Sequence, residues 1–113
     1  MDLSKVRDLF EAVLPGAVYH IEARTTNDKY IVWAEDGQVG ASYADDKMVD
    51  QEIEGTVDLF TRYEYDHIFD TLQMAMNNSD MTWRFNSTQR ETSTGYFHHE
   101  WVWRMVKSIG KDD

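Results

Sequence analysis

The chain has 113 residues, of which 42% are hydrophobic and 13% aromatic. This composition excludes a disordered or low-complexity protein and is sufficient for one hydrophobic core. Eleven basic residues stand against 21 acidic residues, so the formal net charge is −10, and such a surface repels phosphate backbones and anionic lipid headgroups. We therefore expect one domain over residues 1–106, a frayed tail over residues 107–113, and no specific binding to nucleic acid or membrane.

The sequence contains no cysteine. Disulfides, thiolate zinc sites and a cysteine nucleophile are therefore excluded, and the composition is compatible with the cytoplasm. The first residues carry neither the basic nor the apolar part of a secretory signal, and no apolar run approaches the about 18 residues of a membrane-spanning helix. We expect neither secretion nor membrane spanning.

The first segment has apolar residues at i, i+3, i+7 and i+10, a spacing that predicts a short amphipathic helix. These residues are Leu3, Val6, Phe10 and Val13. Asp2 or Ser4 can cap the start of the helix, and Pro15-Gly16 ends it. Residues 17–24 then alternate loosely between apolar and polar types, which predicts a strand.

Residues 29–34 predict the next strand, because they contain a continuous run of β-forming residues, Tyr30-Ile31-Val32-Trp33. We expect this strand to be covered on both faces. Residues 35–47 contain glycine and acidic residues without a helical or strand period. They predict a long mobile connection, and loops of this length inside a compact domain tend to be functional or disordered.

The period of the apolar residues changes within the next segment. Ile53, Val57 and Leu59 alternate with polar residues over residues 52–62, which predicts a strand with one buried face. A helical spacing of apolar residues follows, and this helix should end at the polar residues 77–80. Its apolar positions are Tyr65, Ile68, Phe69, Leu72, Ala75 and Met76.

Two further strands are predicted. Met81, Trp83 and Phe85 alternate with polar residues, and the last strand extends over residues 96–106. One face of the last strand carries Phe97, Trp101, Trp103 and Met105. We expect the two strands to form a hairpin whose aromatic face packs under both helices.

These elements predict an α+β fold with the order α-β-β-β-α-β-β. A mostly antiparallel five-stranded sheet with both helices on one face satisfies every pattern described above. We find no internal repeat and no linker between domains in the sequence.

The string His98-His99-Glu100 is the feature of the sequence that most resembles a binding site. Neighbouring residues of a strand point to opposite faces, so the two histidines cannot jointly bind one metal ion. We expect His99 to lie at the edge of the aromatic face. His98 and Glu100 should instead face solvent or a neighbouring subunit.

No local motif selects catalytic residues, because the sequence lacks a glycine-rich phosphate loop, an HExxH helix and a GxSxG turn. Asp45-Asp46 and Asp50 lack the regular spacing and the closing glutamate of a calcium loop. We therefore predict no catalytic residue, no cofactor and no metal site. The alternative is a small cytoplasmic enzyme or ligand-binding domain with a pocket near His20, His98 or Glu100.

Several strings occur in an order that is typical of one family. Lys29-Tyr30-Ile31-Val32-Trp33 is followed by a loop with Tyr43-Ala44-Asp45-Asp46-Lys47, and then by Val57-Asp58-Leu59-Phe60-Thr61-Arg62 before a helix. The last strand carries Tyr96-Phe97 and Trp101-Val102-Trp103. In these features the chain, up to residue 106, resembles small phage and prophage tail-completion proteins.

The resemblance implies a non-enzymatic virion component of the tail-terminator or head–tail joining type, with an α+β fold. Such proteins assemble as rings, often of six copies, at the neck of the particle, so the implied partners are copies of the chain and other neck or tail-tube proteins. The chain would be in the host cytoplasm during assembly and then in the virion. The family's loop after the second strand commonly contacts these partners, which assigns the contact here to Val39, Tyr43, Asp45, Asp46 and Lys47.

Overall fold

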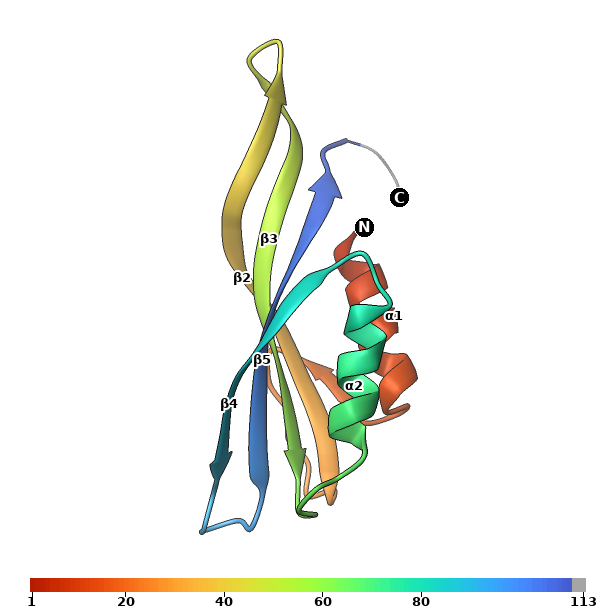
Figure 1. The fold of residues 1–113 in the computed structure, drawn as a ribbon, viewed down its shortest axis with the longest axis vertical. Helices are drawn as coiled ribbons and strands as arrows, with labels where there is room; N and C mark the ends of the chain where they lie inside the picture. The colour runs from red at the N-terminus through yellow and green to blue at the C-terminus, as the bar shows by residue number, and fades with distance from the viewer. Residues whose placement is uncertain (111–113) are drawn as a thin grey trace.

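The structure, a computed structural model, describes residues 1–110. Its elements are α1 (Leu3–Val13), β1 (Val18–His20), β2 (Lys29–Ala44), β3 (Lys47–Thr61), α2 (Ile68–Asn77), β4 (Thr82–Arg90) and β5 (Phe97–Ser108) (Figure 1). This order confirms the predicted order of helices and strands. The strand β5 continues to Ser108, beyond the expected domain end, and residues 111–113 of the predicted tail lie outside the described residues.

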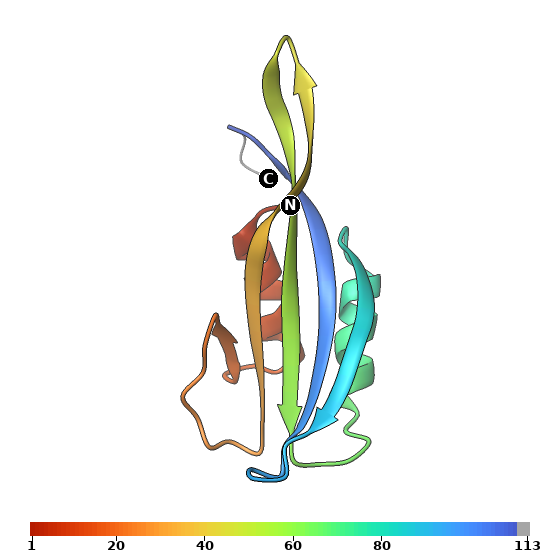
Figure 2. The same ribbon diagram turned by 90° about the vertical axis from the view of Figure 1, so that its left-hand side faces the viewer.

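The five strands form one sheet in the order β1-β2-β3-β5-β4 (Figure 2). The short edge strand β1 runs parallel to β2, and the other neighbouring pairs are antiparallel. The predicted α+β fold with a mostly antiparallel sheet is therefore confirmed. The molecule measures 53 × 25 × 23 Å, and its long axis follows β2 and β3.

Both helices lie on the same side of the sheet, which we call the helix face; the uncovered side is the open face (Figure 1). The helix face carries the hydrophobic core, and the predicted aromatic layer under the helices is confirmed. Its buried strand residues are Ile31, Trp33, Ile53, Val57, Leu59, Trp101, Trp103 and Met105. Its buried helix residues are Val6, Phe10, Val13, Ile68, Leu72 and Met76. None of the described helices is long and apolar enough to cross a membrane.

A close contact between Trp103 and Gly55 joins the central strand β3 to β5. A β-carbon placed on Gly55 would lie 2.3 Å from the Trp103 ring and 2.3 Å from the Ala34 carbonyl oxygen. The Trp103 indole N–H also donates a hydrogen bond to the Thr56 carbonyl oxygen at 2.9 Å. Only glycine at position 55 therefore leaves room for the indole against the backbone of β3.

The prediction that both faces of the strand at residues 29–34 are covered is wrong for one face. Ile31 and Trp33 are buried on the helix face, whereas Tyr30 and Val32 are only half-buried on the open face. A continuous apolar run therefore does not mark a strand with both faces covered here. The open-face residues pack against aromatic neighbours in the sheet, as in the stacked pair of Tyr30 and Phe60.

The predicted mobile connection over residues 35–47 is also wrong. The strand β2 continues to Ala44, β3 begins at Lys47, and Asp45 and Asp46 form the turn between them. Both aspartates have positive φ, 53° and 62°, which is the backbone of a two-residue hairpin turn. Register shifts interrupt the alternation of residues along β2, so the sequence shows no strand period. They lie between Glu35 and Gly37, Gln38 and Gly40, and Ser42 and Tyr43.

The helix α2 begins later than predicted, at Ile68. Tyr65 has a φ of 58° and is 93% exposed, so its place in the predicted apolar stripe is wrong. The rest of the stripe is confirmed, because Ile68, Leu72 and Met76 are buried against the sheet.

Replacing Gly55 with alanine tests the contact with Trp103. We expect Gly55→Ala to lower the free energy of unfolding by about 1–3 kcal/mol, because the added methyl group overpacks the core. Chemical denaturation followed by tryptophan fluorescence measures this change. Gly37→Ala is the matched control, since a β-carbon there has no neighbour within 4 Å; equal stability of the two variants would contradict the packing described here.

Candidate functional site

The β2–β3 hairpin extends beyond the helices and the other strands (Figures 1 and 2). We call its residues 37–49 the arm. The strand β1 pairs with β2 only at residues 31–33, and β5 pairs with β3 only from Asp50 onward. Residues 37–42 of β2 pair with residues 50–54 of β3, which also pair with β5, so only the outer part of the arm, residues 43–49, consists of two strands alone. A hydrogen bond from Ile109 N–H to the Val49 carbonyl oxygen, at 3.0 Å, closes this outer part at its base.

Polar side chains connect the β2 strand of the arm to the part of β3 just below the arm. Gln51 donates a side-chain hydrogen bond to Gln38 at 2.7 Å, and the Ser42 hydroxyl donates to Asp50 at 3.0 Å. An isolated two-stranded hairpin is only marginally stable in water. These cross-strand contacts and the continuity with the five-stranded sheet stabilise the arm as an extension of the folded domain.

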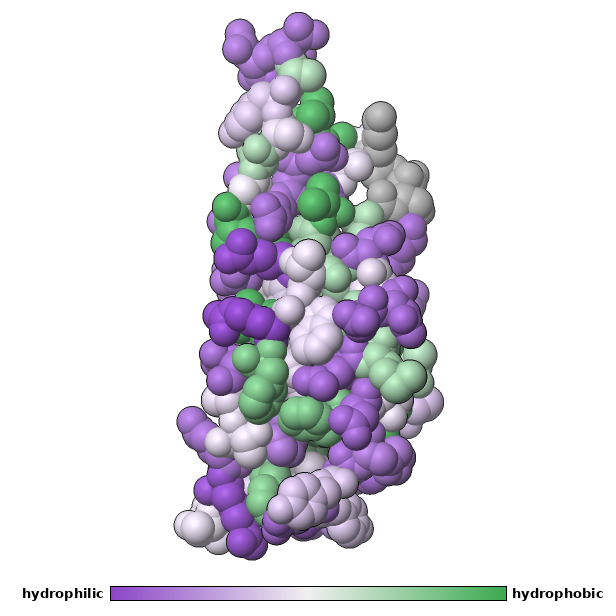
Figure 3. Space-filling model, viewed as in Figure 1, coloured by the Kyte–Doolittle hydropathy of each residue, from purple (hydrophilic) through white to green (hydrophobic). Residues whose placement is uncertain are grey.

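Exposed apolar side chains gather on the arm and around its base. Each of the following residues is at least 40% exposed: Val39, Tyr43, Val49, Val106 and Ile109. In the space-filling view, hydrophobic residues lie among hydrophilic ones along this upper part of the molecule (Figure 3). Other large apolar residues are exposed away from the arm, namely Ile21, Tyr63, Tyr65, Met74 and Phe85, so exposure alone does not mark a contact. The arm differs because Val39, Tyr43 and Val49 share one projecting hairpin, an arrangement that favours a contact surface.

The structure brings the five predicted contact residues together on the arm. Tyr43 pairs with Met48 across the hairpin, one pair away from the Asp45-Asp46 turn, and Lys47 begins the returning strand. Val39 lies farther down β2 at one of the register shifts. Two apolar side chains therefore lie near a charged turn. The contact of these residues with partner proteins stays a prediction, because the structure contains a single chain.

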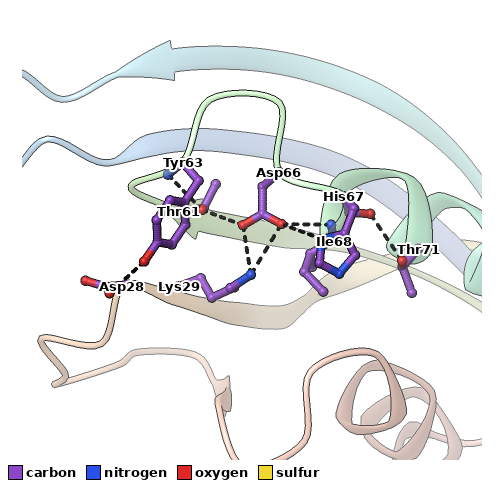
Figure 4. Close-up of polar contacts among 8 residues, drawn as sticks. All are labelled: Asp28, Lys29, Thr61, Tyr63, Asp66, His67, Ile68 and Thr71. Atoms are coloured by element: carbon purple, nitrogen blue, oxygen red, sulfur yellow. Dashed lines mark hydrogen bonds and ion pairs between the residues drawn. The ribbon is translucent and has the colours of Figure 1, made fainter.

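A buried carboxylate lies at the opposite end of the sheet, where β3 leads into α2 (Figure 4). The Asp66 carboxylate accepts hydrogen bonds from the Thr61 hydroxyl at 2.7 Å and from the Ile68 backbone N–H at 3.0 Å. The third partner of the carboxylate is the Lys29 ammonium, with a nitrogen–oxygen distance of 3.2 Å. The carboxylate thus ties the first turn of α2 to the ends of β2 and β3.

These contacts determine the ionisation of Asp66. Burial alone would raise its pKa, but the hydrogen bonds from Ile68 and Thr61 and the ion pair with Lys29 outweigh burial, so the pKa is lowered. The sequence analysis did not identify this residue. The sequence did contain a signal, because an aspartate directly before a helical spacing of apolar residues can accept hydrogen bonds from the first turn of the helix.

A hollow of about 490 Å³ lies beside Asp66, between the start of α2 and the ends of β4 and β5. His99 lines it, with its ring edge-on to Phe69 at a centroid distance of 5.0 Å and its Nδ1 atom 2.7 Å from the Thr88 hydroxyl. Burial, and secondly the neighbouring His98, lower the pKa of His99. The predicted position of His99 at the edge of the aromatic face is confirmed.

His98 and Glu100 lie on the open face of the sheet. The His98 Nε2 atom is 2.8 Å from the Asp58 carboxylate, and this hydrogen bond raises the pKa of the imidazole. The ring also stacks on Phe60 at a centroid distance of 4.2 Å. Glu100 accepts a hydrogen bond from the Asn86 side chain at 2.8 Å. Both residues are therefore partly buried and partnered, rather than simply exposed to solvent.

His20 does not join this group. It stacks on Trp33 on the helix face at a centroid distance of 4.3 Å, and its Nε2 atom is 2.6 Å from the Glu35 carboxylate. His20 does not line the hollow that His98 lines, but the alternative interpretation asks only for a pocket near His20, His98 or Glu100, and a hollow of that kind is present. The open-face hollow, of about 330 Å³, is lined by His98 and Glu100 together with Asp58.

The contacts of Asp66 predict a specific dependence of stability on pH. Because the pKa is lowered in the folded state, the ionised group stabilises the fold above the pKa of an unfolded aspartate, about 3.9. That contribution is lost as the pH falls through the folded-state pKa. Asp66→Asn should lower the free energy of unfolding at neutral pH by about 1–3 kcal/mol, because buried donors lose their charged acceptor.

The difference between wild type and Asp66→Asn should shrink in acid, which denaturant titrations over a pH series measure. Asp80→Asn, at an exposed position, is the matched control and should behave like wild type. A difference for Asp66→Asn that stays constant between neutral pH and about pH 3 would show that ionised Asp66 does not stabilise α2.

Among known proteins, only solved structures give a match to this chain. No protein-family model matches the sequence, and no curated protein matches it. Among solved structures, a chain of the virion of a native gene transfer agent particle is similar, with a TM-score of 0.57 and 12% sequence identity. The match covers 90% of this chain and 87% of that chain. The two chains thus share a fold over almost their whole length.

Proposed function

We propose that this chain is a non-enzymatic structural subunit of a phage or prophage virion. It belongs to the tail-completion type, as a tail terminator or head–tail connector, and it assembles as a ring at the neck of the particle. Its partners are copies of itself and other neck or tail-tube proteins, which it meets in the host cytoplasm before it becomes part of the virion. The observation that carries this proposal is the arm, which presents apolar side chains away from a filled core.

The filled core supports a role in assembly rather than in catalysis. Trp101 and Trp103 are fully buried between the sheet and the helices, so they fill the centre of the helix face and leave room for a ligand only at its end, in the hollow beside Asp66.

The arm has the composition of a protein contact. Tyr43 and Val39 supply apolar area, and tyrosine is among the residues enriched at the energetic centres of interfaces. Asp45, Asp46 and Lys47 would form a polar rim around them. Because the arm projects from one end of an elongated molecule, it can reach a neighbouring copy in a ring.

The likeness to a chain of a virion particle supports the same proposal at the level of fold. The charge of the chain is also compatible with it. A formal net charge of −10 suits a ring through which DNA passes without adhering. The resemblance of the sequence to tail-completion proteins agrees with both observations.

A cross-linking experiment tests the arm as the contact between subunits. The chain has no cysteine, so Tyr43→Cys provides a single attachment point for a photoactivatable maleimide cross-linker. We expect covalent oligomers of the labelled protein, both in the concentrated protein and in cells that produce the particles. Denaturing gels should show a ladder that stops at the number of subunits in the ring.

Met74→Cys is the matched control, because Met74 is a similarly exposed apolar residue on α2, away from the arm. It should give no ladder. Tyr43→Ala without a cross-linker should weaken assembly by about 2 kcal/mol, or roughly thirtyfold, if the side chain is an interface anchor. Equal cross-linking from both positions, or none from position 43 even in particles, would contradict the proposal.

A further inference from the structure

Three possible metal ligands come together on the open face, at a site that the proposed assembly role does not use. His98 and Glu100 are two residues apart on β5, so their side chains point to the same face. Asp58 lies directly opposite Glu100 in the β3–β5 register. One ligand atom from each of the three residues lies within 4.8 Å of the others, and this is the one such group found among residues 1–110.

The distances fit a transition-metal ion after a small adjustment. Zinc binds imidazole nitrogen and carboxylate oxygen at about 2.0–2.2 Å with tetrahedral geometry, so two ligand atoms on one ion lie about 3.4 Å apart. The ion would replace the proton that His98 Nε2 and Asp58 now share in their 2.8 Å hydrogen bond, and rotations of the Asp58 and Glu100 side chains would bring the three ligand atoms to the ion. A mixed nitrogen and oxygen set favours zinc-like ions over calcium and magnesium, which prefer oxygen ligands alone.

Surrounding residues already orient the ligands. Phe60 stacks on the His98 ring, with an angle of 20° between the planes, and the Glu91 carboxylate lies 3.8 Å from the His98 Nδ1 atom. A metal-bound histidine commonly donates its second ring N–H to a carboxylate, and Glu91 would have to move closer than 3.8 Å to accept that hydrogen bond. Asn86 binds one oxygen of Glu100, which leaves the other oxygen of that carboxylate to face an ion.

The open-face hollow of about 330 Å³ next to these residues has room for water molecules to complete the coordination. Glu22 also lines this hollow, so three carboxylates share it with one imidazole. A divalent cation would compensate this excess of negative charge. We propose that Asp58, His98 and Glu100 form a binding site for a divalent transition-metal ion of the zinc type, which would connect β3 to β5 across the open face.

Calorimetric titration of untagged, chelator-treated protein with zinc chloride at neutral pH tests this site. We expect about one ion per chain, and NMR signals of the His98 imidazole should shift on addition of zinc. His98→Gln and Glu100→Gln each remove one ligand and should weaken zinc binding about tenfold or more. Asn86→Ala removes the hydrogen bond that orients Glu100 and should weaken zinc binding about tenfold.

His20→Gln is the matched control. His20 forms a similar pair with the Glu35 carboxylate, but on the helix face and outside the three-ligand group. It should leave zinc binding unchanged. Circular dichroism checks that each variant folds. If His98→Gln does not fold, Glu100→Gln alone decides the test. Absence of zinc binding, or an equal loss in His20→Gln and Glu100→Gln, would overturn the proposal.

Discussion

The contact between the Trp103 indole and the backbone of Gly55 is the constraint on which the rest of the fold depends. It places β5 against β3 in a single register, because a shift by one residue would move every core side chain of β5 to the open face. With this register, Trp101 and Met105 join Trp103 on the helix face. The helices α1 and α2 then have one continuous apolar surface to cover, which explains why both lie on the same side.

Because the core fills the helix face, the groups discussed above lie at three places around it. The arm extends from one end of the sheet, the Asp66 carboxylate holds the start of α2 at the other end, and the open face carries the group around His98. The three places differ in physical character. Asp66 has its partners within the chain and serves the fold, the arm presents apolar area without a covering element, and the open face concentrates negative charge. These differences are the basis of the two proposals, association through the arm and cation binding on the open face.

The sequence predicted the features that depend on local periodicity. The order of elements, the buried stripe of α1 and the aromatic face of β5 follow from patterns of two or 3.6 residues, and all are confirmed. The arm was missed because three register shifts remove the alternation from β2. The group of Asp58 with His98 was also missed, since residues from different strands meet only through the register of the sheet. Periodicity within one strand carries no information about such pairing.

The central claim is that the core is filled and that subunits associate through the arm. The most direct test is hydrogen–deuterium exchange, compared between the isolated protein and the chain in assembled particles. The account predicts that the β5 core segment is protected in both states. It also predicts that residues 37–49 exchange readily in the isolated protein and become protected on assembly. Arm residues that exchange equally in both states, with new protection over α1 and α2 instead, would contradict it.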